Sequence, residues 1–314
     1  MALAAIGAAV AGDALLVLGP WFPLALLGRA VVGLGSGAGF VAGLDLVRAG
    51  GGGHVWRGVY GGATMVGAGV ALMVLPELTN ATSWRAPYWT SLALALLAAV
   101  PTLAAGNLPR IGHASERVAG LRDLVPLGLL QAATFGLAVV AGHWAVPLLE
   151  RHGAGAAVAG LAAGLILSAG IVTRPAGGML TATRPRAVVL AGLLGVSVGA
   201  LVLALPLPLG LQTLGALLFG LAAGLPFAVV FAAAQRLHPE APGTAVGVVN
   251  GVSILLILVA TPVAGLAFGL PGDGRLAFAG MAALAGSAVL LLRRAPLERD
   301  NPPSERAKER PPWP

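Results

Sequence analysis

Two charged residues, Asp13 and Arg29, interrupt the first long apolar stretches of the chain, eight residues before and eight residues after Trp21. If both flanks are helices joined by a turn at Trp21, a rise of about 1.5 Å per residue places both side chains about 12 Å from the turn. We predict that they face each other or a shared aqueous cavity. As a functional pair, Asp13 would accept and release a proton while Arg29 alternates between it and a substrate group. As a structural pair, they would simply neutralise each other.

Polar side chains within the later apolar stretches are further candidates. Gln131 and Thr134 share one face of a helix, three residues apart, and His143 lies near the far end of the same stretch. Asn250 occupies the position that matches Thr64 in the internal repeat described below. Each of these residues could line a central binding cavity. The alternative is hydrogen bonding between helices, which membrane helices use routinely.

Charged residues at the ends of the stretches predict a different role. Asp45 and Arg48 close the second stretch, and we interpret them as a charge network that stabilises a gate. Arg174 and Arg186 would serve the same kind of network or anchor to phospholipid headgroups. The histidines lie on different segments without metal-ligand spacing, and no nucleophile is flanked by a base, so no enzyme, metal or cofactor is predicted.

The composition shows what must position these residues. The chain is 57% hydrophobic and only 10% charged, with a mean hydropathy of +0.89, whereas soluble domains carry about 25% charged residues. Apolar runs recur near the roughly 20 residues needed to cross a bilayer. Lipid offers no partner to an open strand edge, so the crossings must be helical and the fold all-α. The ten predicted spans are 2–19, 24–47, 56–78, 86–106, 124–148, 155–177, 187–205, 210–234, 244–269 and 276–292.

Arginine predicts the orientation of these spans. Ten spans place alternate loops on one side, and that side collects fifteen of the 19 basic residues. The opposite side holds only Arg85, Arg151 and Arg275. The positive-inside rule then predicts a multi-pass protein of the cytoplasmic membrane with both termini in the cytoplasm. The sequence pI near 11.3 reflects these flanking residues, so no nucleic-acid partner is predicted. High Ala, Gly and Arg usage suggests a bacterial gene.

The chain also repeats itself at an offset of 186–187 residues. The matching pairs are Gly33 with Gly220, Gly37 with Gly224, Phe40 with Phe227, Gly61 with Gly247, Pro76 with Pro262, and Pro20 with Pro206. Repeats in the same sense predict two similar halves, an architecture of many transporters. We predict a four-span bundle at 1–106, a cytoplasmic linker at 107–123, a six-span bundle at 124–292 and a disordered cytoplasmic tail at 293–314.

The spans 124–148 and 155–177 have no counterpart in the first half. We therefore expect two further helices encoded before Met1, lost through a wrong start site or a damaged gene. The alternative is a native protein of ten helices. Coding sequence upstream of Met1 for two more apolar spans would decide between them.

Several strings resemble motifs of the major facilitator superfamily (MFS) over essentially the whole chain. Arg29 followed by Gly33, Gly35 and Gly37 resembles the Arg-x-x-x-Gly motif of its fourth helix. The string from Gly170 to Gly178, followed by Arg184 and Arg186, resembles its signature loop between helices eight and nine, although the acidic residue usual there would fall near Ala182. Two further resemblances are Trp56-Arg57-Gly58, which is similar to the start of the fifth helix, and Trp84-Arg85, which is similar to the entry to the sixth.

This resemblance implies an MFS-like bundle of two pseudo-symmetric halves, with four helices in the first half and six in the second. It implies a secondary active transporter that moves a small molecule by alternating access, coupled to protons. Its partners would be the substrate, protons and the lipid bilayer. Efflux of drugs or metabolites and uptake of a small anion both stay open. The alternative is a non-transporting truncated membrane protein or scaffold, which would show no substrate flux.

Overall fold

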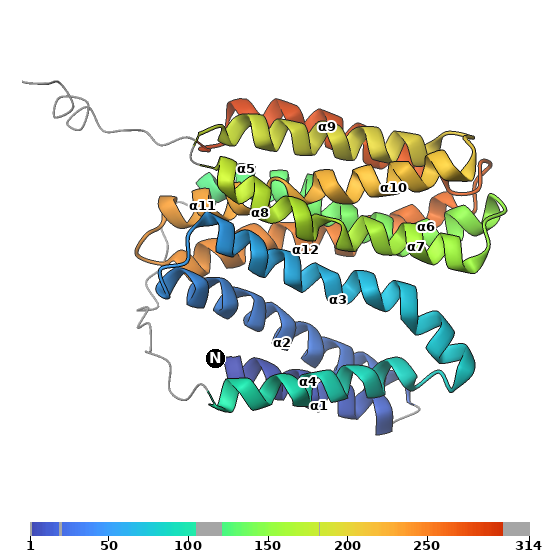
Figure 1. Ribbon diagram of the computed structural model, residues 1–314, viewed down its shortest axis with the longest axis horizontal. Coiled ribbons are helices and arrows are strands. Elements are labelled where there is room, and N and C mark those ends of the chain that lie inside the picture. The colour runs from blue at the N-terminus through green and yellow to red at the C-terminus, as the bar shows by residue number, and fades with distance from the viewer. Residues whose placement is uncertain (1, 19–20, 105–120, 182, 298–314) are drawn as a thin grey trace, which may run out of the picture.

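The structure is a computed structural model that describes residues 2–18, 21–104, 121–181 and 183–297 (Figure 1). These residues form helices and the turns between them, without a strand in any described range. The all-α prediction is therefore confirmed. Most of the predicted linker at 107–123 and of the predicted tail at 293–314 lies outside the described residues.

The first half of the chain holds four long helices. They are α1 (Ala2–Leu18), α2 (Phe22–Ala49), α3 (His54–Ala81) and α4 (Ala86–Ala104). Close approach of α1 and α2 depends on glycine, because a Cβ on Gly12 would lie 2.6 Å from the carbonyl oxygen of Gly28. Small residues let membrane helices pack backbone to backbone in this way. Helix α4 packs against α1 on the same side of the molecule (Figure 1).

The second half is divided into more and shorter helices. It contains α5 (Val125–Gln131), α6 (Leu137–Arg151), α7 (Ala156–Ser168), α8 (Gly170–Leu180), α9 (Pro185–Ala204), α10 (Leu209–Gly224), α11 (Phe227–Leu237), α12 (Pro242–Ala267) and α13 (Arg275–Ser287). Short 3-10 turns at Leu121–Leu124 and Ala288–Arg293 begin and end this half. A π-helical segment, η2 (Ala132–Gly136), joins α5 to α6.

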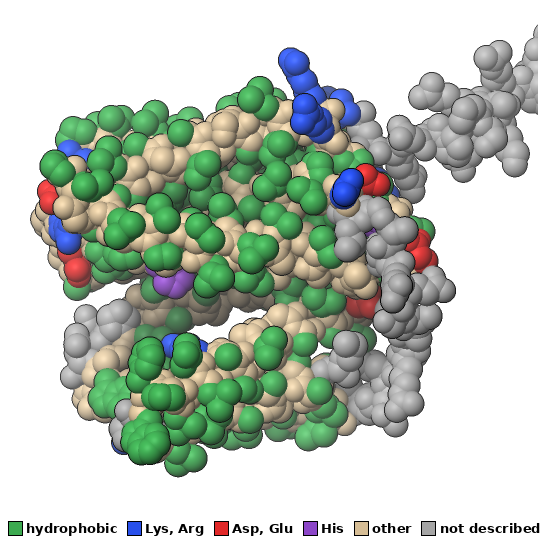
Figure 2. Space-filling view, turned by 180° about the vertical axis from the view of Figure 1, so that it is seen from behind, with side chains coloured by type: hydrophobic (Ala, Val, Ile, Leu, Met, Phe, Trp, Pro, Cys, Tyr) green, Lys and Arg blue, Asp and Glu red, His purple; other side chains and the backbone are tan. Residues whose placement is uncertain are grey.

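Joined across these breaks, the helices are long and apolar enough to cross a bilayer. Nine described segments meet that requirement, among them Arg122–Arg151, Ala156–Leu180 and Leu209–Leu237. Helix α1 is apolar but has 17 residues. Figure 2 shows hydrophobic side chains over the flank of the molecule and charged side chains gathered toward its two ends. The chain is a multi-pass membrane protein.

The turns divide between two ends, which we call the arginine-rich end and the arginine-poor end. At the arginine-rich end, a Cβ on Gly178 would lie 3.0 Å from Val55 Cα, and Arg236 donates a hydrogen bond to the carbonyl of Leu297 (3.0 Å). At the arginine-poor end, Arg151 donates to the carbonyl of Phe268 (2.7 Å). Each of these contacts joins segments that the arginine pattern assigns to the same side.

Helix α3 joins the two halves by packing along α7 and α8. A Cβ on Gly69 would lie 2.8 Å from the carbonyl oxygen of Gly164, and one on Gly62 would lie 3.0 Å from Ile171 Cα. Helix α2 meets α12 of the second half. Away from these contacts the two halves are separated. Figure 2 shows a hollow between the body that contains α1 and α4 and the rest of the molecule.

Candidate functional site

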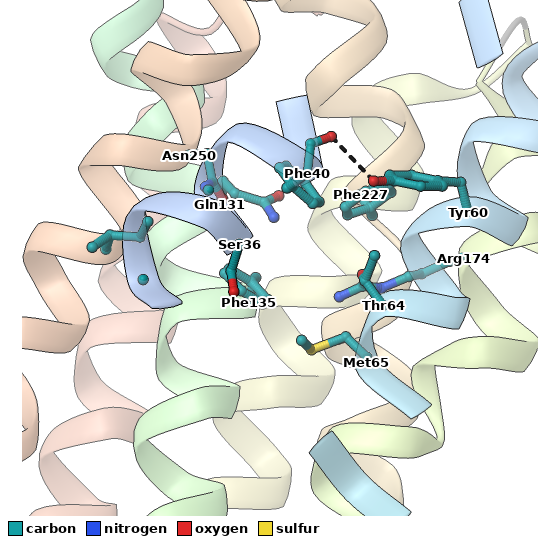
Figure 3. A pocket seen from close by; sticks show the side chains of 13 residues that line it. Ser36, Phe40, Tyr60, Thr64, Met65, Gln131, Phe135, Arg174, Phe227 and Asn250 are labelled. Carbon is teal, nitrogen blue, oxygen red and sulfur yellow. Dashed lines mark hydrogen bonds between the residues drawn. The ribbon is translucent and has the colours of Figure 1, made fainter. Parts of the chain in front are cut away.

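A cavity of about 420 Å³ lies between the two halves, where α2 and α3 face α5, η2, α8, α11 and α12. Most of its wall is apolar, with a few polar groups from both halves (Figure 3). A volume of this order matches the roughly 300–1,000 Å³ of small-molecule sites. The lining residues are Gly33, Ser36, Gly37, Phe40, Tyr60, Thr64, Met65, Gln131, Phe135, Arg174, Phe227, Asn250 and Ile254.

Positions related by the sequence repeat meet at this cavity. Phe40 and Phe227 match in the repeat, and their rings pack edge to face with centroids 6.2 Å apart. Thr64 and Asn250 also match in the repeat, and both line the cavity. The two halves thus contribute equivalent positions to one central space. Thr64, Gln131 and Asn250, which the sequence offers as cavity candidates, are among the lining residues.

Aromatic rings form one wall of the cavity. The Tyr60 hydroxyl donates to the carbonyls of Gly39 (3.2 Å) and Phe40 (3.3 Å) on α2, and Figure 3 draws the second bond. The ring of Tyr60 lies against Gly43, where a Cβ would collide with it. Phe227 in turn packs edge to face on Phe231, with centroids 4.8 Å apart. These contacts fix the rings on both sides of the boundary between the halves.

Gln131, the last residue of α5, and Phe135 of the π-helical segment η2 both line the cavity. Gln131 is buried, and among the described atoms its Oε1 has no hydrogen-bond partner. Single π-helical turns in α-helices are frequent at functional sites. Thr134 does not line this cavity, in contrast to the prediction. Its hydroxyl donates to the carbonyls of Leu130 (3.0 Å) and Gln131 (3.3 Å), because it turns back onto its own helix.

Arg174 is the cation of the cavity, although the sequence placed it in a charge network at the helix end. Only 3% of its surface is exposed. Its Nη1 donates to the carbonyl of Gly61 on α3, and its Cζ lies 4.3 Å from the Phe227 ring centroid and 5.9 Å from that of Phe135. The prediction was wrong because the helix continues to Leu180, which places Arg174 about 9 Å inside it at a rise of 1.5 Å per residue.

Asp13 and Arg29 do not form the predicted pair, and neither lines this cavity. Asp13 is buried and accepts a hydrogen bond from the Ser91 hydroxyl (2.6 Å). Arg29 is exposed, and its Cζ lies 5.4 Å from the ring centroid of Tyr88. Both partners belong to α4, which packs against α1. The prediction considered only the two antiparallel helices, and a third helix supplies the actual partners.

The other predicted residues lie away from the cavity. His143 is exposed, and its Nδ1 lies 2.7 Å from the carbonyl oxygen of Val139 one turn earlier. Asp45 and Arg48 form an ion pair (3.6 Å) at the arginine-rich end of α2. A Cβ on Gly243 of α12 would lie 3.6 Å from Asp45 Oδ2, so this pair stands where the halves meet. Arg186 is exposed near the start of α9.

Several lining residues were missed as cavity candidates by the sequence reasoning. Ser36, Tyr60, Met65 and Phe135 are uncharged residues within apolar stretches, so the positions of ionisable groups do not indicate them. A signal did exist for Phe40, because it matches Phe227 in the repeat. Matching positions in two facing halves are expected to converge on the axis between them.

An all-α membrane bundle with a cavity between two related halves has the architecture of a transporter. A family model of the Major Facilitator Superfamily matches residues 1–253, and the chain belongs to this family. Among solved structures it is similar to the crystal structure of the human organic anion transporter MFSD10 (TETRAN), with a TM-score of 0.69 and 16% identity. That match covers 93% of this chain and 76% of the other. A search of curated proteins finds no match.

Proposed function

We propose that the protein is a secondary active transporter that exposes the cavity between its halves alternately to the two sides of a bacterial cytoplasmic membrane. The observation that carries the proposal is the cavity itself, lined from both halves at repeat-related positions. Family membership supports a transporter rather than an enzyme. The arginine-rich end faces the cytoplasm, with both termini there, as the positive-inside rule requires.

The substrate is a small molecule, and two classes fit the composition of the chain: amphipathic compounds for efflux and small anions for uptake. The single cation in the wall favours an anion, since no lining residue is acidic in the described part of the chain. The human neighbour is an organic anion transporter, which points in the same direction.

Proton coupling is assigned to Asp13. It is the one buried acidic residue in the described ranges. A carboxylate inside a membrane helix is costly, so its presence there makes it a candidate for a functional role. Asp13 follows Gly12, where α1 closely approaches α2, and α2 lines the cavity with Gly33, Gly37 and Phe40. Protonation of Asp13 would weaken its bond from Ser91 of α4 and so loosen α1 from α4, which would free α1 to move against α2.

Gating at the cytoplasmic side is assigned to the Asp45–Arg48 pair. The pair lies at the end of α2, next to Gly243 of the opposite half. Closure of this end would keep the pair against α12, and opening would separate them. Ion pairs and interfaces of this kind are the bistable contacts that conformational switching uses.

Flux in proteoliposomes tests the proposal. Purified protein is reconstituted, a pH gradient is imposed, and uptake of two probes is measured, benzenesulfonate as an anion and ethidium as an amphipathic cation. We expect accumulation of at least one probe that collapses when the gradient is dissipated. Asp13→Asn should lose accumulation but retain exchange of probe across the membrane, while Glu150→Gln, at an exposed acid, should behave as the parent protein.

Absence of flux of either probe under any gradient would contradict the transporter proposal and favour the scaffold alternative. Accumulation by Asp13→Asn equal to that of the parent would remove Asp13 from the coupling step while leaving transport in place.

A further inference from the structure

We infer that the cavity binds a monoanionic aromatic acid, with its acid group on Arg174 and its ring among Phe40, Phe135 and Phe227. The inference rests on the proposed function in one respect: it assumes that the transported molecule binds in this cavity. It follows from four observations on the described residues: an uncompensated cation, the way that cation is held, the aromatic wall and the free amide opposite.

The charge of Arg174 is not balanced within the cavity. The side chain is almost fully buried, and none of the described residues that line the cavity is acidic. Removing a cation from water is expensive unless it is paired. A bound anion would supply the missing partner, whereas a bound cation would add a second positive charge in a poorly screened site. The cavity therefore selects for negative charge.

The guanidinium of Arg174 is fixed in place before any ligand arrives. Nη1 is held by the Gly61 carbonyl, and the Phe227 ring supports the face of the group. Its Nε has no hydrogen-bond partner among the described atoms. Figure 3 shows the group directed toward Thr64, inside the cavity. A planar guanidinium in a fixed orientation is suited to carboxylates and sulfonates, whose oxygens it can bind in pairs.

The wall around Arg174 is suited to a flat ring. Phe40, Phe135 and Phe227 all line the cavity, and their edges and faces offer stacked or edge-to-face contacts. The Tyr60 hydroxyl is already bonded to two backbone carbonyls, so this residue offers mainly its ring. An inorganic anion would make no aromatic contact with these rings. The wall thus favours an organic acid with an aromatic body.

Two amides face the cation from the other side of the cavity. In Figure 3, Gln131 and Asn250 appear on the opposite side of the view from Arg174 and Thr64. The Gln131 Oε1 is buried and lacks a donor among the described groups. A hydroxyl or amino group on the ring, opposite the acid, would satisfy it. Acids with such a group should bind more tightly than the unsubstituted parent acid.

Ligand binding to the purified chain in detergent tests the inference without requiring transport. The probes share one ring and differ in charge: benzenesulfonate, neutral benzenesulfonamide and cationic benzyltrimethylammonium. Binding is measured by equilibrium dialysis and by the rise in melting temperature. We expect benzenesulfonate to bind at least about tenfold more tightly than the sulfonamide, a difference of about 1.4 kcal/mol, and the ammonium to bind more weakly still. Nitrate, an anion without a ring, should compete at least about tenfold less well, the same factor in affinity.

Variants locate the effect at Arg174. Arg174→Gln should lower the affinity for benzenesulfonate at least about tenfold and abolish the preference over the sulfonamide. Arg174→Lys keeps the positive charge but lacks the planar guanidinium, so it should retain part of the preference for benzenesulfonate over the sulfonamide. Arg184→Gln removes an exposed arginine at the start of α9 and should bind as the parent does. Because the three-probe comparison uses the parent protein, the test stands even if Arg174→Gln does not fold.

The inference is overturned if the sulfonamide or the ammonium binds as tightly as the sulfonate, if nitrate competes equally, or if Arg184→Gln loses as much affinity as Arg174→Gln. Sulfonate binding without flux in proteoliposomes would contradict the proposed function and support the site. Ethidium flux unaffected by Arg174→Gln, with no sulfonate binding, would support the function and overturn the site.

Discussion

Arg29 and Arg174 both interrupt apolar membrane helices, yet their surroundings differ in every respect that matters for binding. Arg29 lies in the first half, exposed, with its guanidinium near the ring of Tyr88. Arg174 lies where the halves meet, buried and held between a backbone carbonyl and two aromatic rings. A charged residue within a membrane span therefore indicates a binding site when the surrounding helices bury it and supply no residue of opposite charge.

The packing of the two regions differs in the same way. In the first half, no residue of the span Ala86–Leu103 is buried, whereas in the second half 78% of an 18-residue stretch of Leu209–Leu237 is buried. The part of the second half around α10 and α11 therefore encloses its neighbours, and α3 extends that enclosure to the boundary between the halves. The cavity forms at this boundary, not within the loosely covered α1–α4 body.

The largest effect is expected at the helix crossing between the halves. Gly58 on α3 is buried, and a Cβ there would collide with the backbone of Arg174 and lie 2.7 Å from Pro175 Cα. Gly58→Ala should destabilise the protein by about 1–3 kcal/mol, because backbone atoms cannot rotate away from the added methyl group. The measurement is the melting temperature in detergent, together with the yield of monodisperse protein.

Gly67→Ala is the matched control on the same helix. Gly67 is exposed and a Cβ there meets no atom within 4 Å, so alanine should be neutral or stabilise by up to about 1 kcal/mol through its greater helix propensity. Equal losses at both positions would mean that α3 does not pack on α8 as the structure shows.

A smaller effect on benzenesulfonate affinity should distinguish the aromatic ring that contacts Arg174 from the ring that contacts Arg29. Phe227→Leu keeps apolar bulk but removes the ring under Arg174, and a desolvated cation–π contact is worth about 2 kcal/mol. Tyr88→Leu removes the ring near the exposed Arg29, where such a contact is worth about 0.5–1 kcal/mol. Dialysis with benzenesulfonate should therefore show a loss of affinity for Phe227→Leu and none for Tyr88→Leu. The reverse order would contradict the assignment of the cavity as the binding region.

Much of this arrangement could be predicted from the sequence, because it depends on one-dimensional patterns. Hydropathy indicates the spans, arginine counts indicate which loops share an end, and the repeat indicates that Thr64 and Asn250 occupy equivalent positions. The environment of Arg174 could not be predicted in this way. It depends on where α8 ends and on the Phe227 ring, which comes from a helix more than fifty residues further along the chain. The hydrogen bond between Asp13 and Ser91 of α4 could not be predicted either, because residue spacing within α1 and α2 does not indicate which third helix packs against them.

The smallest effect concerns pH at the arginine-poor end. His152 accepts a hydrogen bond from Arg275 Nε (3.0 Å), and its pKa is lowered from 6.5 by partial burial and then by the nearby Arg275 charge. The unfolded chain therefore binds the proton more readily than the folded one. The contribution of neutral His152 to the free energy of unfolding is fully present above pH 6.5, the pKa of the unfolded chain. This contribution is lost as the pH falls through the lower pKa of the folded chain.

We expect the melting temperature to decline slightly from pH 7 to pH 5, with a shallower decline in His152→Gln, measured at constant ionic strength. The effect is small because His152 is only partly buried, and because a hydrogen bond with Gln212 and then the charge of Asp273 raise its pKa against the lowering causes. A melting temperature that rises on acidification, with the rise lost in His152→Gln, would contradict the lowered pKa of His152 in the folded chain.

The central claim is that the cavity between the halves is the transport site, open alternately to each side. The chain contains no cysteine, so single cysteines can be introduced without background. Ser36→Cys lines the cavity, and Thr134→Cys, fully buried beside it, is the control. In oriented proteoliposomes, a membrane-impermeant thiol reagent should label Ser36→Cys from either side, depending on the gradient, with protection by benzenesulfonate and no labelling of the control. Labelling from one side only under every gradient, or labelling that benzenesulfonate leaves unchanged, would contradict the account.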